Sequence, residues 1–258
     1  MLIFGIAVLV AAVVGFFFMR KARGELHAMI GAETLPVSEL EQRRSTADEL
    51  GGRGGFRERC EVVGAAHPRP EGLLVSELSS SECVWYRYRV RRHYERQRSG
   101  PDNRTRRERK IQTLVEHTSG EGYAVQDDGG QLIGVDPNGT RPDHPERVVK
   151  RFEPHQKQGP TLFGVQLPRM FDLSGTIGYE YEEWIIRPGQ RLYVLGEVHD
   201  RIGPLVIAKP EQGYFIISTR SEQELRRTRR KRHTLLSTGV LIAAPLGLLL
   251  TALGAFQG

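Results

Sequence analysis

Leu2–Met19 has the sequence LIFGIAVLVAAVVGFFFM, and Leu235–Phe256 has the sequence LLSTGVLIAAPLGLLLTALGAF. A helix crosses the hydrocarbon core of a bilayer with about 20 mostly apolar residues, because only intrahelical hydrogen bonds can satisfy its backbone there. Both stretches meet this requirement, the first near its lower limit. The polar segment between them, of roughly 200 residues, is long enough to form one hydrophobic core. We therefore expect a membrane hairpin, in which two transmembrane helices enclose one soluble domain.

The first apolar stretch, residues 2–19, is interpreted as a retained anchor rather than a cleaved signal peptide. A signal peptide has basic residues before its apolar segment and small residues at its cleavage site. Here only Met1 precedes the apolar residues, and Arg20, Lys21 and Arg23 follow them. Bulky Phe side chains occupy the place of the cleavage site. A retained transmembrane helix is therefore favoured.

Basic residues flank both apolar stretches on the side of the soluble domain. Arg20, Lys21 and Arg23 follow the first stretch, and RRTRRKR at residues 226–232 precedes the second. Lys and Arg near membrane ends are retained on the cytoplasmic side. The formal net charge of +6 also suits a domain beside an acidic membrane. The sequence thus predicts a two-pass protein of the cell membrane with a cytoplasmic domain, the extracytoplasmic side being the alternative.

Residues 20–55 are expected to form a helical connector. Thr34 or Ser38 is placed to cap a helix that ends near Leu50, with Leu40 and Leu50 on its inner side. Glycines directly after Leu50 then end the helical pattern. The connector would join the first span to a domain of a different character.

The clearest strand pattern spans Glu82–Glu95, where two sets of residues alternate. Alternation places successive side chains on opposite faces of a sheet. The expected core face comprises Val84, Tyr86, Tyr88 and Val90, and the expected solvent face comprises Trp85, Arg87, Arg89 and Arg91. A polar loop over Arg96–Arg107 and a return strand over Arg109–His117 would complete an antiparallel hairpin.

Further short strand patterns follow, separated by turn residues such as Pro188-Gly189. They lie at Tyr123–Gln126, Gln131–Val135, Gly178–Ile186, Arg191–Val198, Leu205–Ala208 and Tyr214–Ser218. Many short strands with Gly and Pro between them are typical of an antiparallel barrel or sandwich. We expect a mainly-β domain over residues 56–219, with an OB-like barrel as one such form. A capping signal beginning at Ser221 then predicts a helix over 221–256 that includes the second span, residues 235–256.

Residues that carry catalytic or metal chemistry are sparse in the β-rich segment. Its two cysteines, Cys60 and Cys83, are too few for a cysteine-rich zinc site and are expected to be reduced thiols. Zinc-protease, P-loop, dinucleotide-binding and nucleophile-elbow motifs are absent from the sequence. The acidic residues Glu180, Glu182 and Glu183 are interpreted as cross-strand partners of arginines. We expect no catalytic residue, no metal site and no cofactor.

Basic residues are the strongest candidates for a binding role. The candidate binding residues are Arg87, Arg89, Arg91, Arg104, Arg106 and Arg107 in the hairpin, and Arg227, Arg230 and Lys231 before the second span. We expect them to contact anionic lipid headgroups or an acidic protein partner at the bilayer surface. Nucleic acid is disfavoured as a ligand, because the alternation turns Tyr86 and Tyr88 toward the core and away from the arginines.

Five motifs in the sequence resemble those of a known family. They are EVVGAA at 61–66, SECVWYR at 81–87, YAVQD at 123–127, GQRLYVLG at 189–196 and YFIIS at 214–218. In this order, and between two flanking spans, they resemble the GIDE ("beside a membrane") domain of the mitochondrial-type E3 ubiquitin ligases. The resemblance extends over residues 24–256, nearly the whole chain.

The resemblance implies a relation to ubiquitin ligases but not their activity. In the eukaryotic members, ubiquitin transfer depends on a zinc-binding RING after the second span, whereas this sequence ends at Gly258, directly after that span. We therefore expect a bacterial-type member that is a noncatalytic, membrane-anchored interaction or scaffold domain. The alternatives are an E3 ubiquitin-protein transferase and a structural subunit of an envelope complex. The family's domain faces the mitochondrial intermembrane space, which differs from the cytoplasmic side predicted here.

Overall fold

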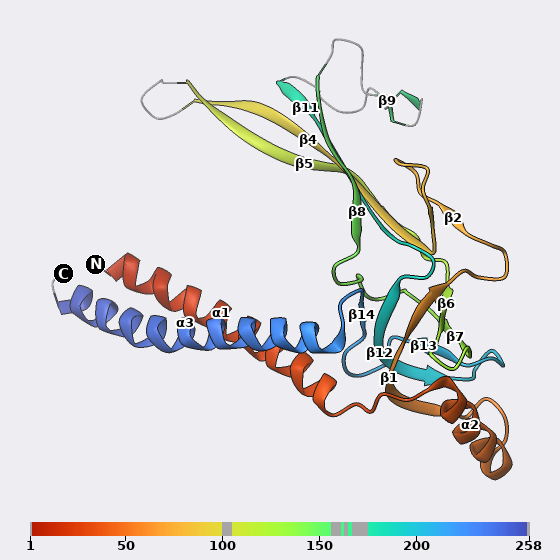
Figure 1. Cartoon of the computed structure of the whole chain (residues 1–258). Helices are drawn as coiled ribbons and strands as arrows, with labels where there is room; N and C mark the ends of the chain where they lie inside the picture. Colours follow the sequence, from red (N-terminus) through yellow and green to blue (C-terminus); the bar gives the residue numbers. More distant parts are fainter. Residues whose placement is uncertain (1, 100–104, 156–160, 163–164, 167–174, 257–258) are drawn as a thin grey trace.

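The computed structural model describes residues 2–99, 105–155, 161–162, 165–166 and 175–256. Within this part of the chain, two long terminal helices lie side by side and extend from a β-rich domain (Figure 1). The helices are α1 (Leu2–Ile30), α2 (Val37–Gly51) and α3 (Glu222–Phe256). The strands are β1 (Arg57–His67), β2 (Leu74–Val75), β3 (Glu82–Cys83), β4 (Trp85–Ser99), β5 (Thr105–Thr118), β6 (Tyr123–Gln126), β7 (Leu132–Val135), β8 (Glu146–Pro154), β9 (Thr161–Leu162), β10 (Val165–Gln166), β11 (Thr176–Ile186), β12 (Arg191–His199), β13 (Val206–Ala208) and β14 (Ile216–Ser218). The predicted fold class is confirmed: apolar terminal helices enclose a mainly-β domain with an N-terminal helical segment.

Five of the described strands close into a barrel. Around it, β1 pairs with β6, β6 with β7, β7 with β13, β13 with β12, and β12 again with β1. The β7–β13 pairing is parallel and the other four are antiparallel. Counted along the chain, the first, second, third, fifth and fourth barrel strands are neighbours in that order, which is the connectivity of an OB-type barrel. The strand β14 pairs with Tyr193–Leu195 of β12.

A glycine on β1 allows the barrel to close. Residues 57–65 of β1 pair with β12, and residues 65–67 pair with β6, so the strand changes partners at Ala65. At the neighbouring Gly64, a Cβ atom would lie 2.1 Å from the main-chain oxygen of Gln126. Only a residue without a side chain permits this approach between β1 and β6. The enclosed core includes the fully buried residues Val62, Val125, Val194, Ile207 and Ile217.

The prediction that Trp85 faces solvent is wrong. Its side chain is 1% exposed and packs in the barrel core with Val84 and Ile186. The strand β4 begins here, at the end of the barrel, where both of its faces are covered. Alternation separates core from solvent only for a strand with one open face, so the pattern does not hold at this position.

A second sheet, which we call the arm, projects from the barrel (Figure 1). Among the described residues its four strands lie in the order β5-β4-β11-β8. They arise from two insertions into the barrel, one between β1 and β6 and one between β7 and β12. Backbone pairing of β4 with β5 continues to Ser99 and Thr105. The described residues of the loop predicted over Arg96–Arg107 are therefore strand, and residues 100–104 lie outside the described residues. The far end of the arm bends toward the side on which α1 and α3 extend (Figure 1).

The helix α2 is positioned by the barrel rather than by the predicted caps. Its N-cap residue is Pro36, which makes no side-chain cap. A carboxylate oxygen of Asp127, in the β6–β7 turn, instead accepts the main-chain N–H of Val37 at 2.8 Å. Leu40 is buried as expected, but Leu50 is 86% exposed. The predicted inner position of Leu50 is wrong, since the buried residues of α2 are confined to its first turns.

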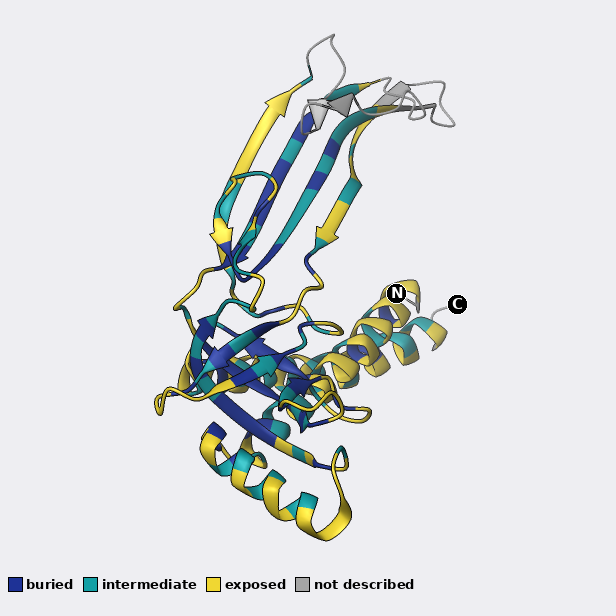
Figure 2. Cartoon of the chain, turned by 90° about the vertical axis from the view of Figure 1, so that its right-hand side faces the viewer, coloured by how far each residue is buried: buried dark blue, intermediate teal, exposed yellow. Residues whose placement is uncertain are grey.

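The helices α1 and α3 form an antiparallel pair whose contacts depend on glycine. A Cβ at Gly5 would lie 2.5 Å from Oγ1 of Thr251, and a Cβ at Gly247 would lie 2.9 Å from Leu9. Small residues let two helix backbones approach closely within a membrane. Each helix is long and apolar enough to cross a membrane, and outward-facing residues such as Phe17 are exposed. Burial is concentrated instead in the barrel and in the central strands of the arm (Figure 2).

The barrel-side ends of both helices pack against the barrel. Met29 of α1 and Leu225 of α3 pack against Tyr193, Leu195 and Ile216 in one buried cluster. The cap predicted for α3 is confirmed, because Oγ of Ser221 accepts the main-chain N–H of Glu224 at 3.3 Å. The terminal helices are thus joined to the barrel by packed side chains and not by loose linkers alone.

Candidate functional site

The predicted arginines of β4 lie on one face of the arm, where they pair with acidic residues of the neighbouring strands β11 and β5. Arg89 is opposite Glu182 in the β4–β11 register, and Arg91 is opposite Glu180. The Arg89 guanidinium is 2.6 Å from the Glu182 carboxylate, and Arg91 is 2.9 Å from both carboxylates. Arg87 pairs with Glu116 of β5 at 2.8 Å. The prediction that acidic residues of β11 serve as cross-strand partners of arginines is confirmed for Glu180 and Glu182.

This ion-pair lattice is largely shielded from solvent. The Glu182 side chain is 5% exposed, and those of Arg89 and Arg91 are 25% exposed. Burial opposes ionisation of Glu180, but the hydrogen bond from His93 and the charge of Arg91 hold the pKa of this carboxyl below its usual range. The guanidinium groups of Arg87 and Arg89 also lie over the Trp184 ring, 5.1 and 5.4 Å from its centroid. These arginines therefore serve the architecture of the arm, and little of their charge is open to a ligand.

The predicted arginines nearer the arm tip differ from those of the lattice. Arg107 is exposed. Arg106 is located by its backbone, which pairs with Arg98 across the hairpin. Arg104 lies outside the described residues. Of the predicted hairpin arginines whose side chains are described, Arg107 is thus the most accessible.

Tyr86 and Tyr88 of β4 point away from Arg87, Arg89 and Arg91, as the alternation predicts. The His117 ring lies against Tyr86 and Tyr88, with centroid distances of 5.8 and 5.6 Å. Burial raises the pKa of both tyrosines above the ordinary value. Because these rings face the interior of the arm, they do not form an exposed stacking platform of the kind that binds single-stranded nucleic acid.

The basic residues before the second span divide into an inner and an outer set. Arg226 donates to the main-chain oxygen of Met29 at 2.6 Å, and Arg229 is 2.8 Å from Glu25 of α1. The outer set comprises Arg227, Arg230 and Lys231, all exposed. None of these three forms an ion pair with a residue in the described ranges of the chain. The outer set is the accessible part of the sequence-predicted site.

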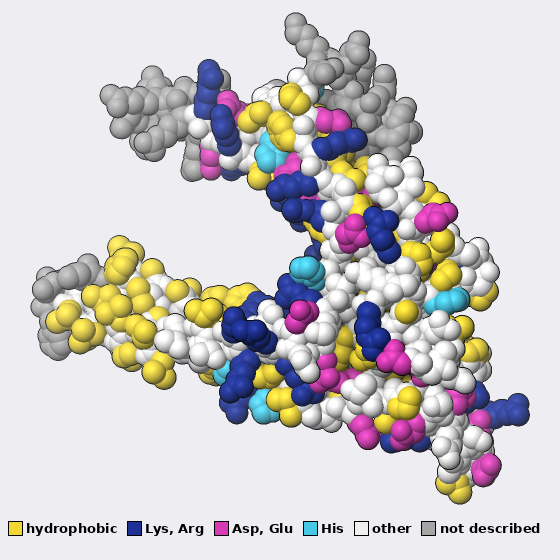
Figure 3. All heavy atoms as spheres, in the orientation of Figure 1, with side chains coloured by type: hydrophobic (Ala, Val, Ile, Leu, Met, Phe, Trp, Pro, Cys, Tyr) yellow, Lys and Arg dark blue, Asp and Glu magenta, His cyan; other side chains and the backbone are white. Residues whose placement is uncertain are grey.

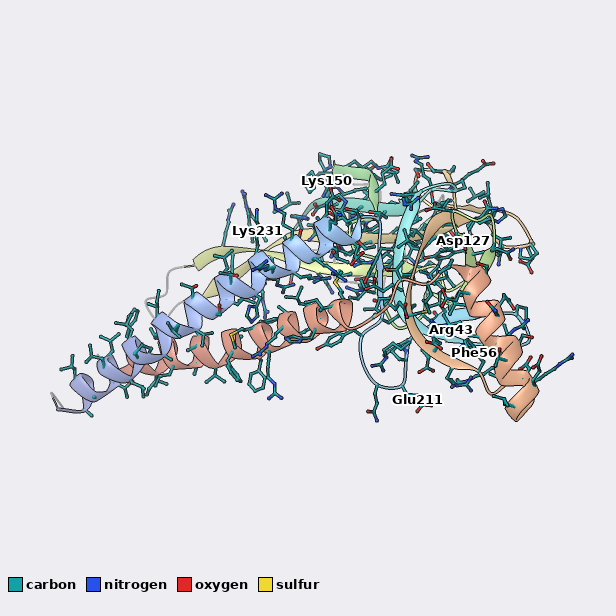
Figure 4. All side chains as sticks on the ribbon, turned by 60° about the horizontal axis from the view of Figure 1, so that its bottom comes forward. Arg43, Phe56, Asp127, Lys150, Glu211 and Lys231 are labelled. Atoms are coloured by element: carbon teal, nitrogen blue, oxygen red, sulfur yellow. The ribbon has the colours of Figure 1, made fainter. Side chains whose placement is uncertain are left out.

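The arm and the helix pair, which carry the two parts of the predicted site, border a common space (Figure 3). The arm and the helix pair extend from the barrel so that the molecule has a concave side, and several Lys and Arg side chains lie along it (Figure 3). Lys150 of β8 and Lys231 of α3 are found on the same side of the molecule (Figure 4). The structure therefore brings basic residues of the arm and of α3 to one side, although Arg87, Arg89 and Arg91 are occupied by ion pairs.

Several buried polar groups escaped the sequence interpretation. Glu61 is fully buried and accepts hydrogen bonds from the hydroxyls of Tyr193 and Thr34. Burial raises the pKa of this carboxyl, against the effect of those hydrogen bonds. Glu183 is also fully buried and accepts hydrogen bonds from Ser79 and from the Leu78 main chain. The interpretation of Glu183 as a cross-strand partner of an arginine is therefore wrong: its carboxylate is turned to the loop before β3 and accepts hydrogen bonds there.

The nucleophilic groups of the domain are placed where they are unreactive. Cys60 and Cys83 are free and fully buried. Burial raises the pKa of Cys60 to about 12 and that of Cys83 to about 11. A thiol with such a pKa is protonated at neutral pH and is a poor nucleophile.

The described residues present no metal centre: no group of three or more His, Cys, Asp and Glu side chains among them is arranged to hold an ion. The Asp143–Glu146 loop has a structural role instead. The Asp143 main-chain N–H donates to the main-chain oxygen of Ile217, and the Thr219 hydroxyl donates to the main-chain oxygen of His144. These contacts tie the loop to the segment that leads into α3.

Comparison with known proteins gave one match. The family model for GIDE, described as E3 Ubiquitin ligase, matches residues 91–253. The match begins in β4 of the arm, includes most of the barrel and ends within α3. No curated protein and no solved structure matched the chain.

Proposed function

The chain belongs to the GIDE family, and on that premise we propose that it is a noncatalytic interaction and scaffold domain anchored in a membrane by α1 and α3. The exposed apolar surface of the helix pair supports this proposal. Its outward side chains are apolar and exposed, for example Phe17 at 65% and Leu241 at 78%. Placing such a surface in hydrocarbon is favourable by about 25 cal/mol per Å² removed from water.

The barrel would be held close to the bilayer in a fixed orientation. Packing of Met29 and Leu225 with Tyr193 joins both helices to the barrel. In α3, 13 residues precede the apolar stretch that begins at Leu235, and at 1.5 Å per residue they correspond to roughly 20 Å of helix. This spacing suits a domain that stands at the headgroup level and presents its arm to neighbouring molecules.

We propose the cytoplasmic side for the domain. Arg20, Lys21 and Arg23 lie on the barrel side of the first apolar stretch, and the outer set of α3 lies on the barrel side of the second. Basic residues within about 15–20 residues of a span favour the cytoplasmic side. The extracytoplasmic side is the alternative that a topology measurement would distinguish.

The noncatalytic role is supported by what the reactive side chains do in the fold. Cys60 and Cys83 are buried, with pKa values raised to about 12 and 11. Glu180 and Glu182 pair with arginines, and Glu183 holds the loop that precedes β3. Burial leaves the two thiols little reactivity, and the three carboxylates are occupied by ion pairs or hydrogen bonds.

The partners proposed for the domain are the lipid bilayer with its anionic headgroups, and a protein at the membrane surface. Arg107 on the arm and the outer set on α3 are exposed and basic. Basic side chains near an anionic surface contribute about 1 kcal/mol each to its binding. A protein partner would meet the same residues through an acidic surface.

An E3 ubiquitin-protein transferase is the second candidate, favoured by the description of the matching family. The two functions differ in a direct assay. Purified full-length chain is incubated with E1, E2, ubiquitin and ATP. The scaffold function predicts no ubiquitin chains above a reaction without the protein, and chain formation would establish the transferase instead.

The scaffold function is tested by proximity labelling in native membranes. A labelling enzyme is inserted between Ser99 and Thr105, at the far end of the arm, and a matched insertion is made beside Gly203 in the β12–β13 turn. We expect a reproducible set of cytoplasmic neighbours, with some enriched at the arm over the turn. Neighbours no different from those of an unrelated two-pass membrane protein would contradict the proposal.

A further inference from the structure

A surface groove runs along α3 from the barrel toward the apolar span. Its upper part, with a volume of about 610 Å³, is lined by His144, Thr219, Arg220, Glu224, Arg227, Thr228 and Lys231. Its lower part, about 490 Å³, is lined by Arg227, Arg230, Lys231, Thr234, Leu235 and Thr238. The two parts share Arg227 and Lys231, so they adjoin along α3. Volumes of this size are typical of small-molecule sites.

Helical periodicity creates the groove wall. Lining positions of α3 such as Arg227, Lys231, Leu235 and Thr238 are separated by three or four residues, which places them on one face of the helix. The opposite face of α3 carries Arg226 and Arg229, which contact Met29 and Glu25 of α1. The basic residues 226–232 of α3 therefore have two roles. Arg226 and Arg229 contact α1 from one face of the helix, and Arg227, Arg230 and Lys231 line the groove on the other.

The upper part of the groove is positively charged. Arg220, Arg227 and Lys231 line it together with the single carboxylate of Glu224. Arg220 is positioned by a contact of 4.0 Å with Asp143 and by a hydrogen bond of 3.4 Å to Thr228. In the part of the chain that the structure describes, Arg227 and Lys231 have no acidic partner, so their charge is available to an anion.

The lower part of the groove is different in polarity. Beyond Lys231 it is lined by Thr234, Leu235 and Thr238. Leu235 is the first residue of the apolar stretch. From Arg227 to Thr238 the helix rises by roughly 16 Å, at 1.5 Å per residue. Over this length the groove changes from basic and polar to mainly apolar, in the direction that leads into the bilayer.

We propose that this groove binds one anionic phospholipid, with its phosphate at Arg220, Arg227 and Lys231 and an acyl chain beside Leu235 and Thr238. A soluble phosphate would use only the basic part, and a neutral lipid would use only the apolar part. An anionic phospholipid matches both parts in the order in which they occur. The proposal rests on the membrane anchoring proposed above and extends it to a defined lipid site.

The test uses full-length protein in nanodiscs of phosphatidylcholine with a minor fraction of phosphatidylglycerol. Native mass spectrometry counts the phosphatidylglycerol retained by the wild type, by R227Q/K231Q and by the matched control K21Q/R232Q. The control removes two exposed positive charges at the same membrane boundary, from residues that do not line the groove. Loss of about 1 kcal/mol for each basic residue corresponds to an affinity reduced by roughly 5-fold per substitution.

We expect R227Q/K231Q to retain at least tenfold less phosphatidylglycerol, and the control to remain within about twofold of the wild type. Equal losses in both variants would show a diffuse attraction to the surface and overturn the site, as would no loss in either. A second variant, T238W, fills the lower part without changing charge. It should weaken phosphatidylglycerol binding, and unchanged binding would contradict the acyl-chain position.

Two controls separate the sources of failure. Inorganic phosphate should not displace the lipid at equal concentration, and displacement would reduce the site to a simple anion site, against the proposal. Carbonate extraction of the same samples reports membrane insertion independently. If the wild type were released by carbonate, the anchoring itself would fail, whereas an inserted protein without lipid selectivity would refute the groove alone.

Discussion

The carboxylate of Glu25 on α1 lies 2.8 Å from the guanidinium of Arg229 on α3, and the two side chains are only 12% and 16% exposed. The pair lies on the barrel side of both apolar stretches, where the helices would leave the hydrocarbon core. One turn closer to the barrel, Arg226 donates to the main-chain oxygen of Met29. Polar contacts thus fasten the helix pair at its membrane boundary, and glycine contacts pack it within the span.

The ion pair should contribute measurably to stability. Glu25→Gln removes the charge that compensates the largely buried Arg229, so we expect a loss of about 1–3 kcal/mol in the free energy of unfolding. The measurement is denaturant unfolding of the full chain in detergent micelles. The exchanged variant E25R/R229E should recover most of the loss, because it restores opposite charges at the same positions. A loss that is no smaller in the exchanged variant would argue against the pairing.

Helix packing should depend on Gly247 and not on Gly239. A Cβ at Gly247 would lie 2.9 Å from Leu9, whereas a Cβ at Gly239 would meet nothing within 4 Å. Gly247→Leu should separate the helices and destabilise the protein by about 1–3 kcal/mol, while Gly239→Leu should be nearly neutral. Thermal unfolding in micelles, with a spin-label distance between α1 and α3, measures both effects. The same response from both variants would refute the packing described.

The ion-pair lattice of the arm should contribute more to the stability of the fold than to ligand binding. Glu182 is 5% exposed and pairs with Arg89 and Arg91. Glu182→Gln leaves both guanidinium groups without their full partner, so we expect destabilisation of about 2–4 kcal/mol. Arg107→Gln, at an exposed position on the same sheet, should change stability by less than about 0.5 kcal/mol. Hydrogen exchange of the arm amides, measured for both variants, distinguishes these outcomes, and an arm unaffected by Glu182→Gln would contradict the assignment.

The buried Glu61 predicts a pH dependence of defined sign. Burial raises the pKa of Glu61 above its ordinary value of 4.5, and the hydrogen bonds of Tyr193 and Thr34 only partly oppose this shift. A carboxyl whose pKa is higher in the folded state stabilises the fold fully below pH 4.5 and loses that contribution as the pH rises through the folded pKa. The contribution of Glu61 to stability should therefore fall as the pH rises from 4.5 through the folded pKa, and it should change no further above that pKa.

Glu61→Gln should flatten this dependence, because the amide stays neutral and its oxygen still accepts a hydrogen bond from Tyr193. We expect the variant to be at least as stable as the wild type at about pH 8, where Glu61 of the wild type is most ionised. Urea unfolding at a series of pH values measures the two slopes. An unchanged slope in the variant would assign the pH dependence to another group.

The fold could be predicted from sequence wherever a single physical rule determined the structure. Long apolar stretches can satisfy their backbone only as helices, so Leu2–Met19 and Leu235–Phe256 were placed correctly. Alternation placed Arg89 and Arg91 opposite the tyrosine face of β4. It failed at Trp85, where the strand enters the barrel and both faces are covered. It also gave no indication that the arm consists of insertions between barrel strands, because strand pairing depends on residues far apart in the chain.

The candidate site was accessible only in part. The sequence identified the basic residues and, in Glu180 and Glu182, acidic partners for them, but not which arginine meets which carboxylate, since Glu182 reaches Arg89 only through the register of β4 with β11. The cap of α2 was assigned to local residues, whereas the acceptor is Asp127, ninety positions away. Glu61 carried no local signal of burial, because its environment is formed by Thr34, Tyr193 and the barrel together.

Labelling of a single introduced thiol tests whether the domain is anchored in the membrane on the cytoplasmic side. Ile202→Cys places a thiol at a position that is 74% exposed, while Cys60 and Cys83 are buried, with pKa values near 12 and 11, and should react little. Carbonate-washed vesicles of each orientation are treated with a membrane-impermeant maleimide. A membrane-anchored domain on the cytoplasmic side predicts labelling of inside-out vesicles and not of right-side-out vesicles, with the protein in the membrane pellet. Labelling from the outer face, or protein released into the supernatant, would contradict it.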